Sequence, residues 1–357
     1  MTAVVDVADR SFSGDRSQRA HQLTFWLLGL LMIACATSLA VGAAGTSLWG
    51  ALWDMARGAP LTLRDHVVLW DIRLPRTVMG ALVGASLAFS GAAMQGLFRN
   101  PLADPGLIGV SAGAGFGAIV AIVLGGMLPV FIGSLVGPHL VALASFLGSW
   151  ASTLLLYRVS TRMGRTSVAT MLLAGIALGA LLGALSGLLV YKADDQQLRT
   201  LTFWSMGSVA GATWTKLSVA APLMVLPFLA IPLIARGLNG LALGEPAANH
   251  MGIDVQRIKN IAILAVAMAV GAAVAVSGGI GFVGIVVPHL LRLLVGPDHR
   301  FLLRNSALLG ASLLLFADVI SRVVIAPAEL PIGIVTAVIG GPFFLWILLR
   351  QRGLLEM

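Results

Sequence analysis

The stretch VATMLLAGIALGALLGALSGLLVY, residues 168–191, decides the fold class because it contains no charged side chain. A helix needs about 20 apolar residues to cross the hydrocarbon core of a bilayer, so this stretch is long enough to be one membrane span. The same length criterion, applied outward along the chain, predicts about ten spans. They are expected near residues 22–45, 74–97, 105–125, 138–157, 168–191, 214–235, 258–277, 281–295, 302–325 and 331–349. The sequence therefore predicts an all-α, polytopic membrane protein with a single transmembrane domain over residues 1–357.

The composition agrees with this fold class. The chain is 58% hydrophobic and only 11% charged, with a mean hydropathy of +0.95, whereas soluble domains carry about 25% charged residues. A water-soluble fold could not hide so much apolar side chain, so lipid must cover part of it. The net charge of +8 is spread as short basic clusters between apolar runs. That pattern sets membrane topology and argues against nucleic-acid binding.

The distribution of basic residues also predicts the orientation of the spans. With the N-terminus inside, 15 of the 23 Lys and Arg residues fall on the cytoplasmic side and eight on the other, as the positive-inside rule requires. We expect residues 1–21 to form a cytoplasmic segment, both termini to be cytoplasmic, and the first span to be retained. Arg73, Arg76 and Arg322 fall outside, where snorkelling at helix ends is the simplest explanation.

Motifs for catalysis or metal binding are missing from the sequence. It contains no H-E-x-x-H, C-x-x-C or G-x-S-x-G, its six histidines form no spaced cluster, and no lysine follows a glycine as in a Walker A motif. We therefore predict no enzyme activity, no metal and no permanently bound cofactor, and we assign any ATP hydrolysis to a separate chain. Asp318 is the main candidate for ion coupling. Because Arg322 lies one helical turn further, a local ion pair is expected instead, and an ion-coupled secondary transporter remains an alternative.

Three other patterns suggest sites. Glycines at 80 and 84, and at 179, 183 and 187, recur at helical spacing, which allows close helix packing or leaves a smooth wall along a pathway. Residues 236–258 form a polar-to-amphipathic cytoplasmic loop, in which a short helix suits docking to a soluble partner. Residues 192–213 are expected to form an interfacial helix at the opposite side.

Several motifs occur in an order that resembles a known family. They are Ile72-Arg-Leu-Pro-Arg76, the run from Met94 to Gly106 (MQGLFRNPLADPG), Leu243-Gly-Glu245, the run from Gly279 to His289 (GIGFVGIVVPH) and Glu329-Leu-Pro-Ile-Gly333. The sequence resembles the permeases of type II ABC importers, which carry iron-siderophores, haem and cobalamin. The resemblance covers roughly residues 22–350.

The resemblance implies a fold of ten helices and a set of partners. The subunit would form a homodimer around a central pathway in the bacterial inner membrane. Two ATPase subunits would dock on the cytoplasmic face and use ATP, and a periplasmic substrate-binding protein would dock outside.

The resemblance also implies residue roles, which are expectations at this point. Arg73, Arg76 and Arg322 would meet carboxylates of the binding protein. Residues 241–254 would be the coupling helices, with Leu243, Gly244, Glu245, Ala248, Met251 and Gly252 contacting the ATPase. The cytoplasmic gate would comprise Asn100, Leu102, Val168 and Ala169, the last two being apolar where cobalamin carriers have small hydroxyl residues. Gly179, Gly183 and Gly187 would line the pathway.

Two stretches bear on the substrate. Residues 166–176 and residues 194–204 look most like the haem permeases, and the apolar fifth span suits a flat, apolar ligand that must slide. We expect haem as the transported substrate, with ferric siderophores or cobalamin as the alternatives.

Overall fold

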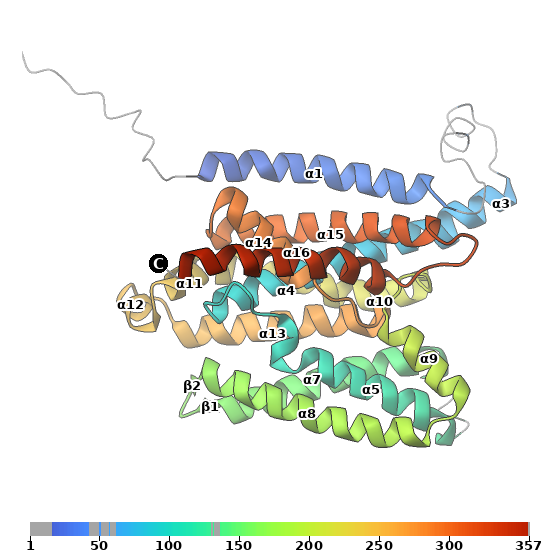
Figure 1. Ribbon diagram of the computed structural model, residues 1–357, viewed down its shortest axis with the longest axis horizontal. Helices are drawn as coiled ribbons and strands as arrows, with labels where there is room; N and C mark the ends of the chain where they lie inside the picture. The colour runs from blue at the N-terminus through green and yellow to red at the C-terminus, as the bar shows by residue number, and fades with distance from the viewer. Residues whose placement is uncertain are drawn as a thin grey trace, which may run out of the picture.

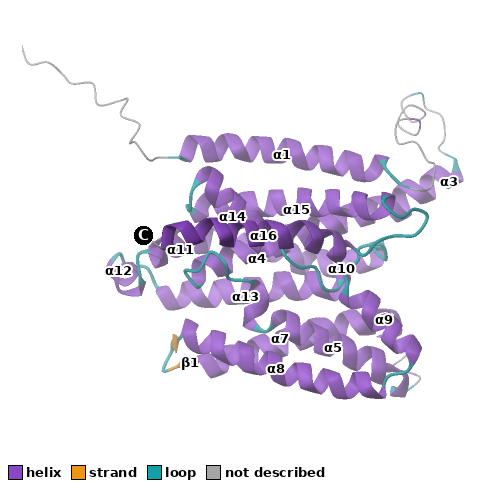
Figure 2. Cartoon of the chain, viewed as in Figure 1, coloured by secondary structure: helices purple, strands orange, loops and turns teal. Residues whose placement is uncertain are grey.

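The chain folds into a bundle of long, roughly aligned helices (Figure 1). The computed structural model describes residues 16–42, 50, 57, 62–129, 131 and 136–355. Nearly all of this is helix, as Figure 2 shows, so the predicted fold class is confirmed. Most of the predicted N-terminal segment, residues 1–15, lies outside the described residues, and the first helix begins at Ser17.

The helices and strands follow one another along the chain with short connections. The first half comprises α1 (Ser17–Ala40), α3 (Leu63–His66), η1 (Val67–Arg73), α4 (Leu74–Leu97), η2 (Pro105–Ile108), α5 (Val110–Leu124), η3 (Gly125–Met127), η4 (Gly137–His139), α7 (Leu140–Ser160), β1 (Thr161–Arg162), β2 (Arg165–Thr166) and α8 (Val168–Lys192). The second half comprises α9 (Asp195–Ser205), α10 (Trp214–Val225), η5 (Leu226–Ala230), α11 (Ile231–Ala242), α12 (Glu245–His250), α13 (Val255–Ser277), α14 (Val283–Val295), α15 (His299–Val323) and α16 (Ile332–Leu355).

The predicted spans match the helices with shifts at their ends. Among the described residues, eight helices are long and apolar enough to cross a membrane, and Val283–Val295 and Ile332–Trp346 are shorter apolar helices. Together they occupy the ten predicted positions, with the eighth short as expected. The first span begins earlier than predicted, at Ser17. The third begins later, because Pro105 starts a separate turn and Gly109, at φ +75°, ends it.

Proline explains the divided sixth span. The apolar stretch Trp214–Ala242 is continuous in direction, but Pro222, Pro227 and Pro232 each remove a backbone N–H. A proline in a helix interior cannot donate the i→i−4 hydrogen bond, and here the stretch changes to a 3₁₀ turn at η5 between α10 and α11.

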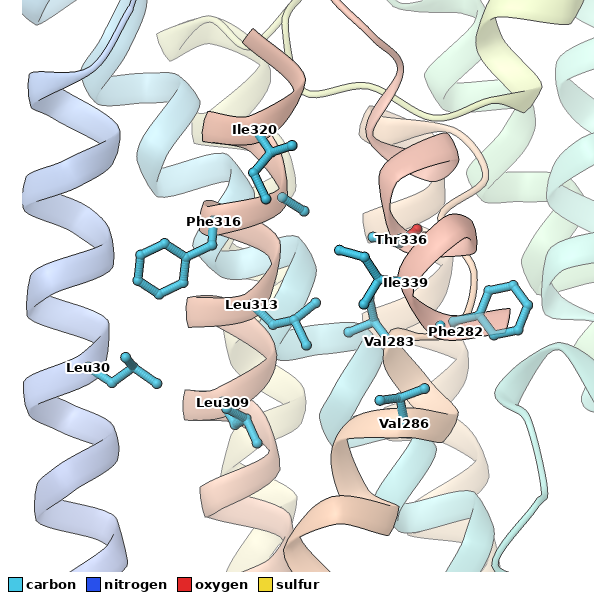
Figure 3. Close-up of a pocket in the computed structure, with 12 residues that line it drawn as sticks. Leu30, Phe282, Val283, Val286, Leu309, Leu313, Phe316, Ile320, Thr336 and Ile339 are labelled. Carbon is cyan, nitrogen blue, oxygen red and sulfur yellow. The ribbon is translucent and has the colours of Figure 1, made fainter. Parts of the chain in front are cut away.

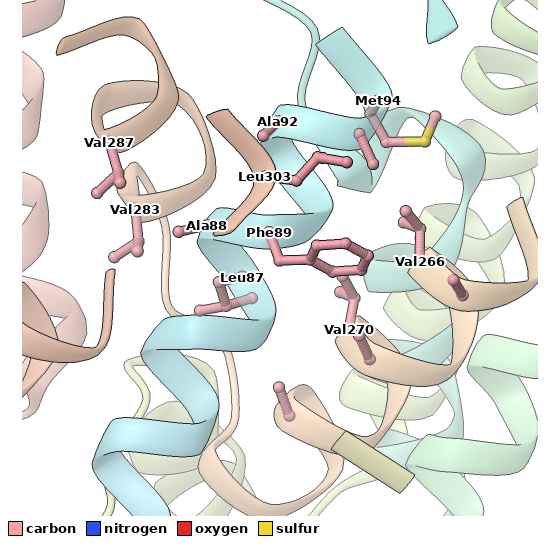
Figure 4. Close-up of a cluster of buried hydrophobic side chains, with 14 of the residues drawn as sticks. Leu87, Ala88, Phe89, Ala92, Met94, Val266, Val270, Val283, Val287 and Leu303 are labelled. Carbon is pink, nitrogen blue, oxygen red and sulfur yellow. The ribbon is translucent and has the colours of Figure 1, made fainter. Parts of the chain in front are cut away.

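Helix α4 forms the centre of the bundle. Of its best membrane-spanning window, 83% is buried within the chain, and it packs against α15, α13 and α14. Figure 4 shows Leu87, Phe89 and Met94 of α4 interlocked with valines of α13 and α14. The Phe89 ring also meets Phe228 edge-on, with 5.3 Å between ring centroids.

Helices α5, α7 and α8 form a separate three-helix group, the lower part of Figure 1. Only 11% of the α8 window is buried within the chain. Its start is fixed by Ser167, whose hydroxyl accepts a hydrogen bond from the backbone N–H of Thr170 at 3.3 Å.

The two ends of the bundle differ. Helix α1 begins and α16 ends at the end that carries α12 and the β1–β2 hairpin, which we call the α12 end (Figure 1). The other end carries α3 and α9 and is called the α9 end. The amphipathic helix expected within residues 192–213 is α9, which begins with a capping box between Asp194 and Gln197.

An apolar crevice of about 280 Å³ lies among α1, α14, α15 and α16 (Figure 3). Its side chains include Leu30, Val286, Leu313 and Phe316, and no charged residue lines it. An uncharged crevice offers no directional polar contact, so the candidate sites were sought at the two ends of the bundle instead.

Candidate functional sites

A cluster of charged side chains joins α4 to α15 at the α9 end. Arg76 of α4 binds Asp318 of α15, with Nη2 and Oδ1 2.9 Å apart, and its Nη1 lies 2.8 Å from Oε1 of Glu329. Arg322 also binds Asp318, with 3.0 Å between Nη2 and Oδ2. The local Asp318–Arg322 pair expected from the sequence is therefore present, and Asp318 is shared by two guanidinium groups.

The arginines also complete the end of α1. The last turn of a helix leaves carbonyl groups without intrahelical partners. Arg73 Nη1 donates to the Leu39 carbonyl at 2.7 Å, and Arg322 Nη1 donates to the carbonyls of Ser38 and Val41 at 3.1 Å each. Positive charge at a helix C-terminus is also favoured by the helix dipole.

The three predicted docking arginines are thus held inside the α9 end. Their exposed fractions are 3% for Arg73, 6% for Arg76 and 5% for Arg322. The Glu329 side chain, in contrast, is 40% exposed. Three guanidiniums beside two carboxylates leave a surplus of positive charge, so the cluster suits an acidic partner even though its arginines already have intramolecular contacts.

The α12 end carries the short helix expected in the amphipathic loop. The structure narrows the predicted segment 241–254 to α12, because Leu241 and Ala242 still belong to α11 and Asp254 caps α13. Gly244 precedes α12 at φ +104°, a conformation that favours glycine. Pro246 occupies the first turn, where its missing N–H is harmless.

The residues predicted to contact an ATPase fall into two groups. Leu243 is 70% exposed and Met251 is 53% exposed, so both large apolar side chains project from the α12 end. Ala248 is buried and attaches α12 to the bundle. The Glu245 carboxylate turns inward, 2.7 Å from Nζ of Lys259 on α13.

The first predicted gate segment is a tight turn after α4. The Asn100 side chain accepts a hydrogen bond from the Leu102 backbone N–H at 2.9 Å, which fixes the turn locally. Arg99, at φ +51°, extends toward α12. Its Nη1 would lie 4.0 Å from a Cβ placed on Gly244, so the turn and α12 are neighbours.

The second predicted gate pair, Val168 and Ala169, opens α8 directly after the β1–β2 hairpin. Val168 is half-buried and Ala169 is exposed. Thr166, two residues before Val168, is 3% exposed, and its backbone carbonyl accepts a hydrogen bond from Lys259 Nζ at 2.8 Å.

The predicted pathway glycines lie on an open face of α8. A Cβ built on Gly179, Gly183 or Gly187 would meet no atom within 4 Å. Close packing within the chain, the simpler explanation of their spacing, therefore does not apply to these three residues. They leave a smooth helix face that no described part of the chain covers.

A polar cavity of about 320 Å³ lies beside the turn that leads into α5. It is lined by Asp104, Ser111, Trp204 and Ser205 together with the glycines of the α13–α14 connection. Asp104 is held by its hydrogen bond from the Gly106 backbone N–H at 2.7 Å. The sequence analysis did not single out this cavity, because its walls come from segments far apart in the chain.

Lys259 was also not recognised as a site residue. In the sequence it contributes only to the count of cytoplasmic charges, yet it is 3% exposed in the structure. Its position at the start of an otherwise apolar span was a signal, since a lysine inside a span needs a partner.

Apolar helices of membrane-spanning length, with charged contacts concentrated toward both ends, define a multi-pass helical membrane protein. The chain belongs to the FecCD transport family, whose model matches residues 30–350. It is 47% identical to the hemin transport system permease protein HmuU of Yersinia pestis over 92% of this chain and 95% of that one. It is 42% identical to the vitamin B12 import system permease protein BtuC of Shigella boydii, over 94% and 98%.

A solved structure shares the fold. A chain from an inward-facing metal-chelate type ABC transporter superposes with a TM-score of 0.80 at 33% identity, covering 92% of this chain and 99% of that one. The predicted family and fold are therefore confirmed.

Proposed function

We propose that this chain is the membrane-spanning permease subunit of an ATP-driven importer that passes haem from a periplasmic binding protein to the cytoplasm. The observation that carries the proposal is the 47% identity to a hemin permease along nearly the whole of both chains. Cobalamin is the second candidate, because vitamin B12 permeases are 42% and 44% identical to this chain.

The proposal gives the two ends of the bundle different partners. At the α12 end, exposed Leu243 and Met251 offer apolar contacts to an ATPase, and Gly252 ends the exposed turn. At the α9 end, a binding-protein carboxylate would compete with the half-exposed Glu329 for Arg76. Both termini would then be cytoplasmic in a bacterial inner membrane, because α1 begins and α16 ends at the α12 end.

The pathway in this proposal follows the uncovered face of α8. A second copy of the chain would face it, so that two sets of Gly179, Gly183 and Gly187 line a central passage in a homodimer. Asn100, Leu102, Val168 and Ala169 would close this passage on the cytoplasmic side. The chain itself performs no catalysis here, and two ATPase subunits would supply the energy.

The test is transport by the reconstituted complex. The permease, its ATPase and its binding protein would be placed in proteoliposomes, and uptake of hemin, cyanocobalamin and a ferric hydroxamate siderophore would be compared. ATP-dependent uptake of hemin above the other two supports the proposal. Preferred uptake of cyanocobalamin would replace haem as the substrate, and uptake that persists without the ATPase would identify an ion-coupled secondary transporter.

The docking role is tested separately by charge reversal. Because Arg73 and Arg322 also complete α1, Glu329→Gln is the informative variant: it frees Arg76 without removing an arginine. We expect Glu329→Gln to strengthen association with the binding protein, most visibly at low salt. Arg76→Glu should weaken it, with thermal unfolding measured in parallel to separate lost docking from lost stability. Unchanged affinity in both variants would leave the arginines with their structural role alone.

A further inference from the structure

A buried lysine connects α12 to the first turn of α8. Lys259 lies on α13, and its Nζ donates to Oε1 of Glu245 at 2.7 Å and to the carbonyl oxygen of Thr166 at 2.8 Å. Glu245 is the first residue of α12, and Thr166 ends the β1–β2 hairpin. A single ammonium group therefore contacts both the short helix at the α12 end and the segment that leads into Val168 and Ala169.

Thr166 is held to α13 by a second side chain as well. Its backbone N–H donates to Oε1 of Gln256 at 2.9 Å, and Nε2 of Gln256 donates to the Thr166 hydroxyl at 2.7 Å. Gln256 and Lys259 are three residues apart and so lie on the same face of α13. Both backbone polar groups of Thr166 are thus bound to this face, and a shift of the face carries Thr166 with it.

The burial of Lys259 shows that this contact is more than packing. Its ammonium group is nearly excluded from solvent, with a side-chain exposure of 4%, and burying a charge is costly unless it is paired and hydrogen-bonded. A methionine of similar length could fill the same space without that cost. What the lysine adds is a directional connection between two segments that have no other hydrogen bond described between them.

We propose that Lys259 is a positioning residue that transmits displacement of α12 to the cytoplasmic start of α8. When a bound ATPase moves α12, Glu245 moves the ammonium group, and the ammonium group moves Thr166 and the turn that holds Val168 and Ala169. The inference rests on the proposed function, since it requires an ATPase at the α12 end and a passage that closes at the start of α8.

The first test measures how tightly ATP hydrolysis is coupled to transport. In proteoliposomes containing the whole complex, with hemin and cyanocobalamin as the probes, Lys259→Met should leave the complex assembled and hydrolysing ATP. Substrate transported per ATP hydrolysed should fall at least about fivefold, the low end of typical coupling between two sites. Lys259→Arg, which keeps a cationic donor, should restore most of it.

Matched variants distinguish this role from a structural one. Arg257→Met removes a charge one turn away on α13, where the side chain is exposed, and should leave the transport ratio unchanged. Glu245→Gln should lower the ratio, and the Glu245→Gln, Lys259→Met double variant should lose no more than the worse single variant, because both act through one contact. If Lys259→Met is not recovered as a folded protein, Lys259→Gln takes its place.

The second test observes the start of α8 directly. Cys35→Ser removes the single native cysteine, and Val168→Cys then reports accessibility to a charged maleimide. With Lys259 present, the labelling rate should differ between the ATP-bound and ADP-bound complex, and with Lys259→Met it should not.

The outcomes separate the two proposals. If the unaltered complex moves neither probe with ATP, the proposed function is wrong and the transmission role falls with it. If the unaltered complex transports, and Lys259→Met or its substitute keeps both the transport ratio and the nucleotide-dependent labelling, the transmission role alone is overturned.

Discussion

Helices α4 and α8 carry the same glycine spacing and use it in opposite ways. In α4 a Cβ on Gly84 would collide with the backbone of Gly310 on α15, so the two helices meet at their backbones. In α8 a Cβ on Gly179, Gly183 or Gly187 would meet open space. The buried share of the two spans differs accordingly, 83% for α4 and 11% for α8.

The difference teaches that small-residue spacing reports a smooth helix face without saying what covers it. For α4 the cover is the chain's own α15. For α8 it is lipid or another subunit, and the proposed homodimer assigns it to a second copy. Substitutions in the two helices should therefore affect different properties, the stability of the single chain in α4 and transport in α8.

The largest effect is expected where α4 is attached to α15 by charge. Asp318 is fully buried between Arg76 and Arg322, and Asp318→Asn leaves two buried guanidiniums without their shared anion. Breaking a buried pair in this way costs about 3–5 kcal/mol. Thermal unfolding in detergent should show it as a strongly lowered midpoint, while Asp195→Asn, at an exposed position on α9, should behave like the unaltered chain. Equal midpoints for the two variants would contradict the anchoring role of Asp318.

The glycine pair itself gives the next largest effect. Gly84→Val forces α4 away from Gly310, and overpacking of this kind costs about 1–3 kcal/mol. Gly183→Val adds the same volume in open space and should leave the unfolding midpoint unchanged. A comparable loss of stability in both variants would mean that α8 is covered within the chain after all.

Transport should reverse the order of these two helices. Gly183→Val narrows the proposed passage in the homodimer, so ATP-driven uptake by the reconstituted complex should fall several-fold while the folded chain remains intact. A matched variant, Ala180→Val, adds a smaller change on a neighbouring face and should transport more than Gly183→Val. Normal uptake with Gly183→Val would indicate that lipid, not a second copy, covers this face.

The smallest effect is expected at the start of α15, the helix that α4 packs against. Burial raises the pKa of the Asp298 carboxyl, but hydrogen bonds from Arg300 and Asn239 lower it more, so the pKa lies below its usual value. Because the folded value is below the unfolded value of about 3.9, the stabilisation is present above that pH and is lost as pH falls through the folded value.

Unfolding midpoints measured between about pH 5 and pH 3 should therefore fall less in Asp298→Asn than in the unaltered chain. The exposure of this carboxyl keeps the difference small. The same acid dependence in both would show that Asp298 contributes nothing to it.

The positions of the spans could be predicted because span length and charge are local properties of the sequence. Residues 168–191 became α8 with one residue added, and residues 74–97 became α4 unchanged. The ends were less accurate where a proline or a glycine overrides hydropathy, as at Pro105 and Gly109.

The candidate sites were predictable only in part, because their partners are distant in sequence. The Asp318–Arg322 pair lies within one helical turn and could be anticipated, whereas Arg76 meets Asp318 across 242 positions. Exposure of Leu243 and burial of Ala248 depend on how α12 sits on the bundle. The contact between Lys259 and Thr166 likewise spans 93 positions, and no local pattern encodes it.

The way Arg73 and Arg322 complete α1 has a consequence for the order in which the chain is assembled. Helix α1 is synthesised first, but the carbonyls of Ser38 and Val41 receive their donor from Arg322, near the end of the ninth span. Until α15 enters the membrane, that end of α1 must remain near water or borrow other donors. The outer end of the first helix is therefore finished only when nearly the whole chain has left the ribosome.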